Sequence, residues 1–266
     1  MNQKQIRRQS VKYPFIISLP HCSERIPEDL KGTFALTNEE IWESTDRGVL
    51  EIFGALPAKK IIFAQWNRLV VDLNRSPGRR DGRGVVPHVD YHGRSIYRSG
   101  CIPDEQEIER RLSEYYWSFH KRLFDSLKEP DIKALFDCHS LNGTGPEEAP
   151  DPGKRRNDII LGNHGDDSGK MSPARGSITC PPEILRLIKK AFEKSRFSVS
   201  LNDPYPGGFI TAFHGKKLTD MGKIAVQIEI NQDLYLEGTP KRLSPIRLEQ
   251  VKTRVLQSFK EITSTL

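Results

Sequence analysis

The sequence predicts an α/β fold, a three-layer sandwich with a mixed, mostly parallel central sheet. Short runs rich in β-branched and aromatic residues alternate with segments of helical periodicity along the 266 residues, as is typical of this class. Several of the runs are continuously apolar, as expected of strands that are covered on both faces. No internal repeat or clear linker divides the chain, so we expect a single domain over residues 1–266.

The predicted strands are short β-rich runs bounded by turn-forming residues. They cover residues 15–19, 60–64, 69–73, 132–137, 158–161, 197–201 and 224–230. Two long segments, 74–102 and 141–157, are crowded with Gly, Pro and charged residues and show no periodicity. Structureless segments of this length inside a compact domain are often functional.

Helices are predicted between the strands from capping signals and apolar stripes. Thr37 and Glu40 have the spacing of a capping box, which opens a helix that runs toward Phe53. The other stripes contain Ile108, Leu112, Tyr115, Phe119 and Leu123; Ile184, Leu185, Ile188 and Phe192, after Pro181 and Pro182; and Leu248, Val251, Val255 and Phe259, after Ser244. We interpret all stripe residues as core and assign them no chemistry.

The composition limits the class of partner. The net charge of +6 suits a small anionic substrate, and nucleic-acid binding is not expected because the basic residues are scattered among 35 acidic ones. No apolar run approaches the roughly 20 residues that cross a bilayer, and the first ten residues lack the apolar stretch of a signal peptide. We therefore expect a cytoplasmic protein without a membrane partner. The four cysteines form no CxxC pair, so neither a disulfide framework nor a structural zinc site is expected.

Three polar side chains follow predicted strands and could share a metal ion. His21 and Glu24 come directly after strand 15–19, and His139 follows strand 132–137. Ligands of open α/β sheets bind beyond the carboxyl ends of the strands. Two histidines and a carboxylate suit catalytic zinc, which keeps a fourth position for water. The alternative is that each histidine is an ordinary hydrogen-bonded surface residue, because an HxxE spacing alone is a weak signal.

A further carboxylate, Glu229, alternates with apolar residues in strand 224–230. A carboxylate in a central strand is costly unless it is paired, linked to a metal or catalytic. We favour a catalytic base over the alternative, an edge-strand charge that points to water.

Substrate contacts are predicted at two places. Asn74 and Arg75 follow strand 69–73, where an arginine could bind a substrate carboxylate through two parallel hydrogen bonds. A salt bridge between Arg75 and a neighbour is an equal alternative. Tyr205 and His214 lie in the turn-rich segment 202–215 and could reach a substrate, although this segment could equally be a plain connection.

Seven segments together resemble the N-formylglutamate amidohydrolase family, which is similar in fold to the zinc carboxypeptidases and the aspartoacylase-type deacylases. They are LPHCSERIPEDL, TDRGVLEIFGA, VVDLNRSP, LFDCHS, DIILGNHG, NDPYPGGFITAFHG and VQIEINQDLY, in family order over residues 19–235. The chain departs from the family at Cys22 and Ser23, where a small residue and a glycine are common. This departure leaves the exact acyl group open.

The resemblance implies hydrolysis of N-formyl-L-glutamate to formate and glutamate, the closing step of one histidine-degradation route. Carried over by residue, it implies His21, Glu24 and His139 as zinc ligands, Glu229 as the catalytic glutamate, and Asn74 and Arg75 as the pair that holds a substrate carboxylate. We therefore expect an amidohydrolase of small N-acyl amino acids with one zinc ion per chain. Two alternatives stay open: a deacylase or carboxypeptidase of another N-acyl amino acid or peptide, and a non-catalytic ligand-binding protein of the same fold.

Overall fold

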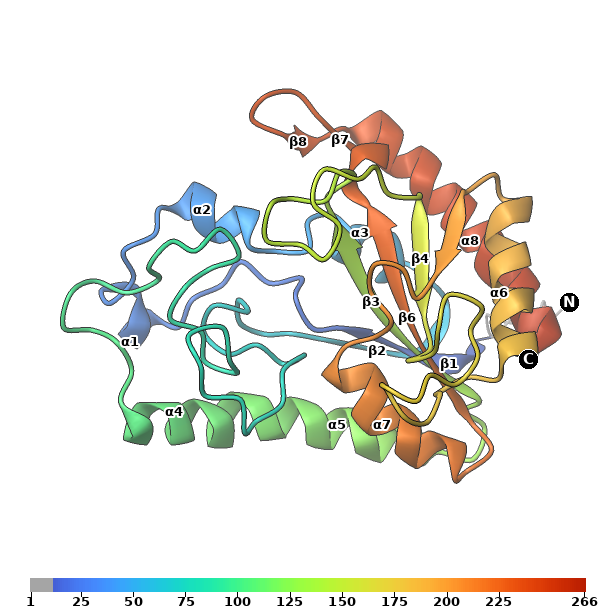
Figure 1. The fold of residues 1–266 in the computed structure, drawn as a ribbon, viewed down its shortest axis with the longest axis horizontal. Coiled ribbons are helices and arrows are strands. Elements are labelled where there is room, and N and C mark those ends of the chain that lie inside the picture. The colour runs from blue at the N-terminus through green and yellow to red at the C-terminus, as the bar shows by residue number, and fades with distance from the viewer. Residues whose placement is uncertain (1–11) are drawn as a thin grey trace, which may run out of the picture.

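A six-stranded mixed sheet forms the middle layer of the protein (Figure 1). The computed structural model describes residues 12–266. Residues 1–11 lie outside this range, and with them the start of the predicted domain and the segment from which we expect no signal peptide. The strand order is β2-β1-β3-β6-β4-β5, with β4 antiparallel to β6 and the other neighbouring pairs parallel. The strands are β1 (Tyr13–Leu19), β2 (Ala58–Phe63), β3 (Ala134–Leu141), β4 (Ile159–Gly162), β5 (Val199–Leu201) and β6 (Ile224–Asn231), with a separate pair β7 (Leu236–Glu237) and β8 (Arg242–Leu243). This topology confirms the predicted α/β class.

Helices cover both faces of the sheet. In Figure 1, α6 and α8 lie to one side of the strands, and α4, α5 and α7 lie along the other. The helices are α1 (Glu28–Lys31), α2 (Asn38–Glu43), α3 (Val49–Phe53), α4 (Glu105–Arg111), the π-helical turn η1 (Leu112–Tyr116), α5 (Trp117–Leu127), α6 (Pro182–Lys194), α7 (Phe209–Thr219), the 3₁₀ turn η2 (Gln232–Leu234) and α8 (Pro245–Thr265). None of these described helices combines the length and the apolar character that a membrane crossing needs.

The two faces of the sheet differ at the carboxyl ends of the central strands. Toward α8 the β3 row is apolar through Phe136 and Cys138, and only its last member, Ser140, is polar. Toward α5 and α7, Leu135 belongs to the core but the next residue on that face is Asp137. Successive side chains of a strand point to opposite faces, so polar residues collect on one face of the sheet, at one end.

The predicted strand 69–73 is wrong, because this apolar run forms a buried turn. Leu69 and Val70 pack in a small cluster outside the sheet. The backbone N–H of Asp72 donates to the carbonyl of Val85, 2.7 Å away, in a loop. Loops bury this run, and a continuous apolar pattern does not distinguish that burial from burial in a sheet.

Two helical predictions also change. The capping box of Thr37 and Glu40 is confirmed, but α2 ends at Glu43 and the chain turns before α3. The left-handed Gly48, with φ of 76°, permits this turn. The turn-rich segment 202–215 contains the start of α7. This helix buries residues on several sides, so it lacks the single apolar stripe from which helices are predicted.

Candidate metal centre and active site

Two adjacent strands carry the polar row at the centre of the site. Asp137 and His139 lie on β3, and Gln227 and Glu229 lie on β6. In the parallel pairing of these strands, Asp137 is opposite Gln227 and His139 is opposite Glu229. Strand register alone therefore places the predicted metal ligand beside the predicted base.

His21, Asp46 and His139 form a buried group with the composition and spacing of a metal site. His21 lies just beyond β1, and its carbonyl accepts a 2.9 Å hydrogen bond from the backbone N–H of Asp46, in the turn before α3. Oδ2 of Asp46 is 2.9 Å from Nδ1 of His139 and 3.6 Å from Nδ1 of His21. Ligand atoms about 2.0–2.1 Å from a tetrahedral zinc ion are about 3.3 Å apart. The two separations from Asp46 bracket this value, and the three ligand atoms all lie within 4.8 Å of one another.

Each histidine has a carboxylate behind it. Nε2 of His21 is 2.8 Å from Oδ1 of Asp72, and Nε2 of His139 is 3.2 Å from Oδ2 of Asp137. When Nε2–H donates to a carboxylate, the neutral ring keeps its lone pair on Nδ1. Metal-binding histidines commonly have such a partner, which fixes both tautomer and ring orientation. The ring of His21 therefore keeps its lone pair on Nδ1, and the Nδ1 atoms of both rings face Asp46.

The charges in this group suit a cation. Nδ1 of His21 is buried and has no hydrogen-bond partner among the described residues, which is costly unless a ligand satisfies it. Burial would raise the pKa of Asp46, but its hydrogen bond to His139 and the nearby imidazole of His21 hold the pKa below the ordinary value. Burial would lower the pKa of His139, but the charge of Asp137 raises it well above the ordinary value. A metal ion would displace this proton, and two imidazoles with one carboxylate are a donor set suited to zinc.

Glu229 has the environment of a group that exchanges protons. Burial, and next the charges of Asp46 and Asp137, raise the pKa of Glu229 to about 8, although the charge of His139 opposes them. Nε2 of Gln227 donates to Oε1 of Glu229 over 3.0 Å and orients the carboxyl group. A cation bound next to it would favour the ionised form.

The side chain of Asn74 is engaged by the protein itself. Its Oδ1 accepts a 2.8 Å hydrogen bond from the backbone N–H of Ile210, in the first turn of α7, and its Nδ2 is 3.2 Å from Nε2 of His139. A Cβ atom at Gly208 would overlap the Asn74 amide, so the glycine is required for this approach. The structure places Asn74 as a support between His139 and α7.

Arg75 keeps much of its hydrogen-bonding capacity. Its Nε is 3.9 Å from Oδ2 of Asp72, and its Nη1 is 3.5 Å from the carbonyl of Asn74. The buried Nε makes no hydrogen bond within the described part of the chain. Arg68, in contrast, donates to Oδ2 of Asp72 over 2.7 Å. Of these two arginines, Arg75 has the guanidinium that can still bind a ligand carboxylate.

Tyr205 and His214 have different surroundings. The hydroxyl of Tyr205 is 3.3 Å from Nη2 of Arg156, which also stacks over the ring. Burial, and next a hydrogen bond with Tyr91, raise the pKa of Tyr205, and the charge of Arg156 opposes the rise. His214 is only 1% exposed, and its Nε2 is 3.0 Å from Nδ1 of His120. Its contacts are with the protein interior.

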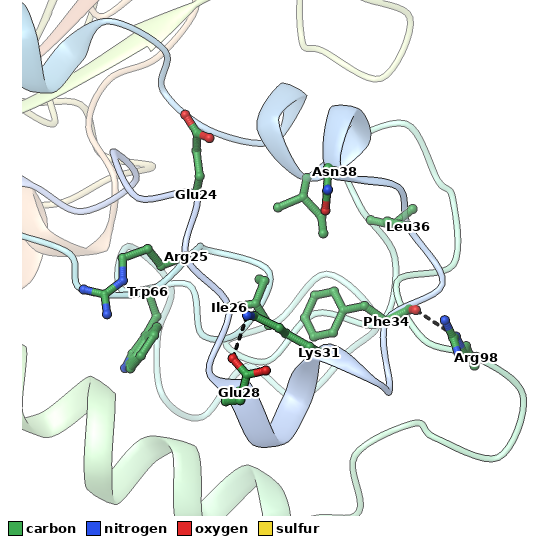
Figure 2. A pocket seen from close by; sticks show the side chains of 11 residues that line it. Glu24, Arg25, Ile26, Glu28, Lys31, Phe34, Leu36, Asn38, Trp66 and Arg98 are labelled. Carbon is green, nitrogen blue, oxygen red and sulfur yellow. Dashed lines mark hydrogen bonds and ion pairs between the residues drawn. The ribbon is translucent and has the colours of Figure 1, made fainter.

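The structure does not bring Glu24 to the two histidines. Glu24 is exposed and lines a cavity of about 780 Å³ beside the segment that follows His21. Figure 2 shows it on the cavity wall with Arg25 and Trp66. Residues three apart share a side in a helix, but residues 22–27 are irregular. The HxxE spacing therefore has no helix to make it a pair of ligands.

Asp46 is the carboxylate of this group that the sequence pattern does not identify. It lies in the segment TDRGVLEIFGA, which is one of those that carry the resemblance but is predicted to be helical. Its proximity to the histidines depends on the turn between α2 and α3 and on the backbone hydrogen bond to His21. The available signal was an acidic residue at a possible helix break, immediately before Arg47 and Gly48.

Comparisons with known proteins find relatives over most of the chain. A family model described as N-formylglutamate amidohydrolase matches residues 13–236, a range that contains every residue of the site described above. The chain is 25% identical over 240 residues to an N-formylglutamate deformylase of Pseudomonas putida, with 86% of this chain and 84% of the relative covered. It is 26% identical over 241 residues to an N-formylglutamate deformylase of Pseudomonas aeruginosa, with 85% and 83% covered.

Two solved structures share the fold. An N-formylglutamate amidohydrolase from Ralstonia eutropha JMP134 superposes with a TM-score of 0.70 at 17% identity, over 97% of both chains. A gene product from Agrobacterium tumefaciens superposes with a TM-score of 0.67 at 21% identity, over 96% of this chain and 92% of that one. At these identities the likeness establishes the fold.

Proposed function

The chain belongs to the N-formylglutamate amidohydrolase family, as its motifs predict, and from that premise we propose that it hydrolyses N-formyl-L-glutamate to formate and L-glutamate with a divalent metal ion. The observation that carries the proposal is the convergence of two Nδ1 atoms, from His21 and His139, on Asp46 beside Glu229. The names of the Pseudomonas relatives support the substrate. The reaction would close a histidine-degradation route.

We propose His21, Asp46 and His139 as the metal ligands, with Asp46 in place of Glu24. Zinc fits the donor set best, and when bound it would polarise the amide carbonyl and lower the pKa of the attacking water. Asp72 and Asp137 hold the two rings so that Nδ1 of each stays available.

Glu229 is the group that moves the proton. Its carboxylate would accept a proton from the water as the oxygen attacks the carbonyl carbon, and would pass it to the amide nitrogen as the C–N bond breaks. The charge of Arg68 acts on both Asp46 and Glu229. Arg68 is held by its 2.7 Å hydrogen bond to Asp72, and we propose that its positive charge stabilises the negative charge that develops on the carbonyl oxygen in the transition state.

The other residues predicted for the site bind the substrate or support the residues that do. We propose that Arg75 binds a carboxylate of the substrate through its free donors, and that Tyr205 contacts the substrate near Glu229. Asn74 and His214 act from within the protein, because their polar atoms contact other residues.

The test is a hydrolysis assay of the purified protein after metal removal and after zinc addition. N-formyl-L-glutamate, N-formyl-L-aspartate and N-formyl-L-leucine should be compared by the formate and free amino acid that they release. We expect zinc-dependent cleavage with a preference for the glutamate derivative. A protein that binds zinc and cleaves none of the three contradicts the proposed reaction.

A second candidate is the alternative that the sequence leaves open, a deacylase of larger N-acyl amino acids. The cavity of about 780 Å³ combines apolar walls such as Phe34 and Trp66 with Arg25 and Arg98, and none of the proposed metal ligands lines it (Figure 2). N-acetyl-, N-butyryl- and N-benzoyl-L-glutamate distinguish the two candidates. Faster cleavage of a long acyl group than of formyl would favour the second.

A further inference from the structure

Residues 72–75 form a short turn that touches both proposed histidine ligands from behind. Asp72 contacts Nε2 of His21 at 2.8 Å, and Asn74 contacts Nε2 of His139 at 3.2 Å. The same turn carries Arg75. Because this turn belongs to no strand or helix, the regular hydrogen-bond ladder of the sheet does not fix its position. Other contacts must hold it.

Two side chains of one helical face hold the carbonyl groups of this turn. Nε2 of His120 is 3.0 Å from the carbonyl oxygen of Leu73, and the hydroxyl of Tyr116 donates to the carbonyl oxygen of Arg75 over 2.8 Å. Residues four apart on a helix are neighbours on one side. Tyr116 and His120 therefore act together on alternate carbonyls of the turn, and each is almost fully buried.

The helix that carries them is irregular at this point. The π-helical turn η1 ends at Tyr116, directly before α5. One inserted residue rotates the side chains after it by about 100° relative to those before it, and such π-turns occur frequently at functional sites. Because of this rotation, the face of α5 that contacts the 72–75 turn does not continue the buried face of α4.

His214 of α7 determines which nitrogen of His120 carries the proton. Nδ1 of His120 is 3.0 Å from Nε2 of His214. For Nε2–H of His120 to donate to Leu73, Nδ1 must accept, and so Nε2 of His214 must be the donor. Nδ1 of His214 is then a buried acceptor, and it has no partner among residues 12–266. A buried unpartnered acceptor reduces stability, so this pair of imidazoles is not explained by stability alone.

We propose that Tyr116, His120 and His214 position the 72–75 turn, and through it Asp72, Asn74 and Arg75, for metal binding and substrate binding. These positioning residues touch neither the proposed metal ligands nor the reacting atoms. The inference rests on the proposed function and extends it to a layer of residues beyond the site. It also gives a role to His214, which the sequence places among substrate contacts.

The variants His120→Leu, His120→Gln and Tyr116→Phe test the proposal. His120→Leu removes the donor to Leu73, whereas glutamine keeps an N–H donor near the position of Nε2. Changes to groups that orient metal ligands weaken metal binding by about 10–100-fold. We expect His120→Leu to weaken zinc binding by about 10-fold and to raise KM for N-formyl-L-glutamate more than it lowers kcat. His120→Gln should recover most of both losses, and Tyr116→Phe should act mainly on KM, because its partner is Arg75.

Thr179→Val is the matched control. Thr179 donates over 2.8 Å to the carbonyl of Ala225, near the amino end of β6, and it is as buried as His120. This variant should lower the thermal midpoint and leave zinc affinity and KM unchanged. Zinc affinity is measured by competition with a chromogenic chelator, so it is independent of turnover.

Four outcomes overturn the inference or separate it from the proposed function. If His120→Leu and Thr179→Val lower the midpoint alike and neither changes zinc affinity or KM, the histidine pair is purely structural. If His120→Leu fails to fold, Tyr116→Phe decides, and an unchanged KM there overturns the inference. A wild type that binds zinc without cleaving the amide contradicts only the proposed function, and the zinc affinities of the variants still test whether the three residues position the turn. A wild type that neither binds zinc nor cleaves the amide overturns the proposed function and the positioning role together.

Discussion

The strand-borne and the loop-borne halves of the site are held in place differently. His139 and Glu229 lie side by side because β3 and β6 are in register, so backbone hydrogen bonds fix their separation. Asp46, Asp72 and Arg75 lie in turns, and they reach the site through hydrogen bonds between segments far apart in the sequence. The comparison indicates that strand register fixes the proposed reacting groups, whereas the loops position the proposed ligand Asp46 and the proposed substrate contact Arg75.

The largest effect on turnover is expected in the strand-borne half. Glu229→Gln should keep the fold and the metal but lower kcat by about 10²–10⁴-fold, because an amide of the same size cannot accept the proton of the attacking water. Steady-state kinetics with a measured zinc content check this. Full activity of this variant would place the base elsewhere in the site.

A smaller effect is expected at Arg75, in the loop-borne half. A charge-assisted hydrogen bond contributes about 1.5–3 kcal/mol, so Arg75→Ala should lose roughly 10–150-fold in kcat/KM. Arg75→Lys should lose less, since it keeps the charge but not the two parallel donors. A substrate with its α-carboxylate converted to an amide provides the control. If the wild type and Arg75→Ala discriminate equally against this amide, Arg75 does not bind that carboxylate.

The carboxylates behind the histidines allow a direct comparison of the two halves. Asp137 is on β3, and Asp72 is in the turn held by Tyr116 and His120. Asp137→Asn and Asp72→Asn should each weaken zinc binding by about 10–100-fold. Asp72→Asn should also raise KM, because Asp72 orders the turn that carries Arg75. Equal KM values in the two variants would show that the loop-borne half does not couple metal binding to substrate binding.

The smallest expected effect concerns stability and pH. Burial lowers the pKa of His120 to about 4 and the pKa of His214 to about 3. The charge of Lys217 also lowers both pKa values, whereas the charge of Asp137 opposes the shift at His120. An unfolded histidine titrates near pH 6.5. Between about pH 6.5 and 4 the unfolded chain therefore binds more protons than the folded one, so the free energy of unfolding falls as the pH falls. The slope is at most about 1.4 kcal/mol per pH unit for each proton.

Urea unfolding of the metal-free protein between about pH 7.5 and 4.5 measures this slope. His120→Gln should show a shallower fall than the wild type, because it has lost one of the two buried titrating groups. Parallel curves would mean that the pair does not contribute to acid sensitivity.

The sequence predicts the strand-borne half well, for a physical reason. Alternation along a strand and the convergence of carboxyl ends are local and topological rules, and they bring His139 and Glu229 together without knowledge of the loops. His21 is found in the same way, since it follows β1 directly.

Local and topological rules of this kind do not predict the loop-borne half. The apolar run 69–73 has the composition of a strand but is buried by loops, so the position of Arg75 is not deduced from a sheet edge. Asp46 comes to the histidines through a helix break and one backbone hydrogen bond across the fold. The contact between His214 and His120 joins two helices whose relative placement no local pattern contains.

The most direct test of the account is a zinc titration of the metal-free wild type, Asp46→Ala and Glu24→Ala, with His139→Ala as the reference for a lost ligand. Isothermal calorimetry measures affinity and stoichiometry in the same experiment. The account predicts one zinc ion per wild-type chain, unchanged binding in Glu24→Ala, and a loss in Asp46→Ala that approaches the loss in His139→Ala. Wild-type affinity in Asp46→Ala together with lost binding in Glu24→Ala would contradict it.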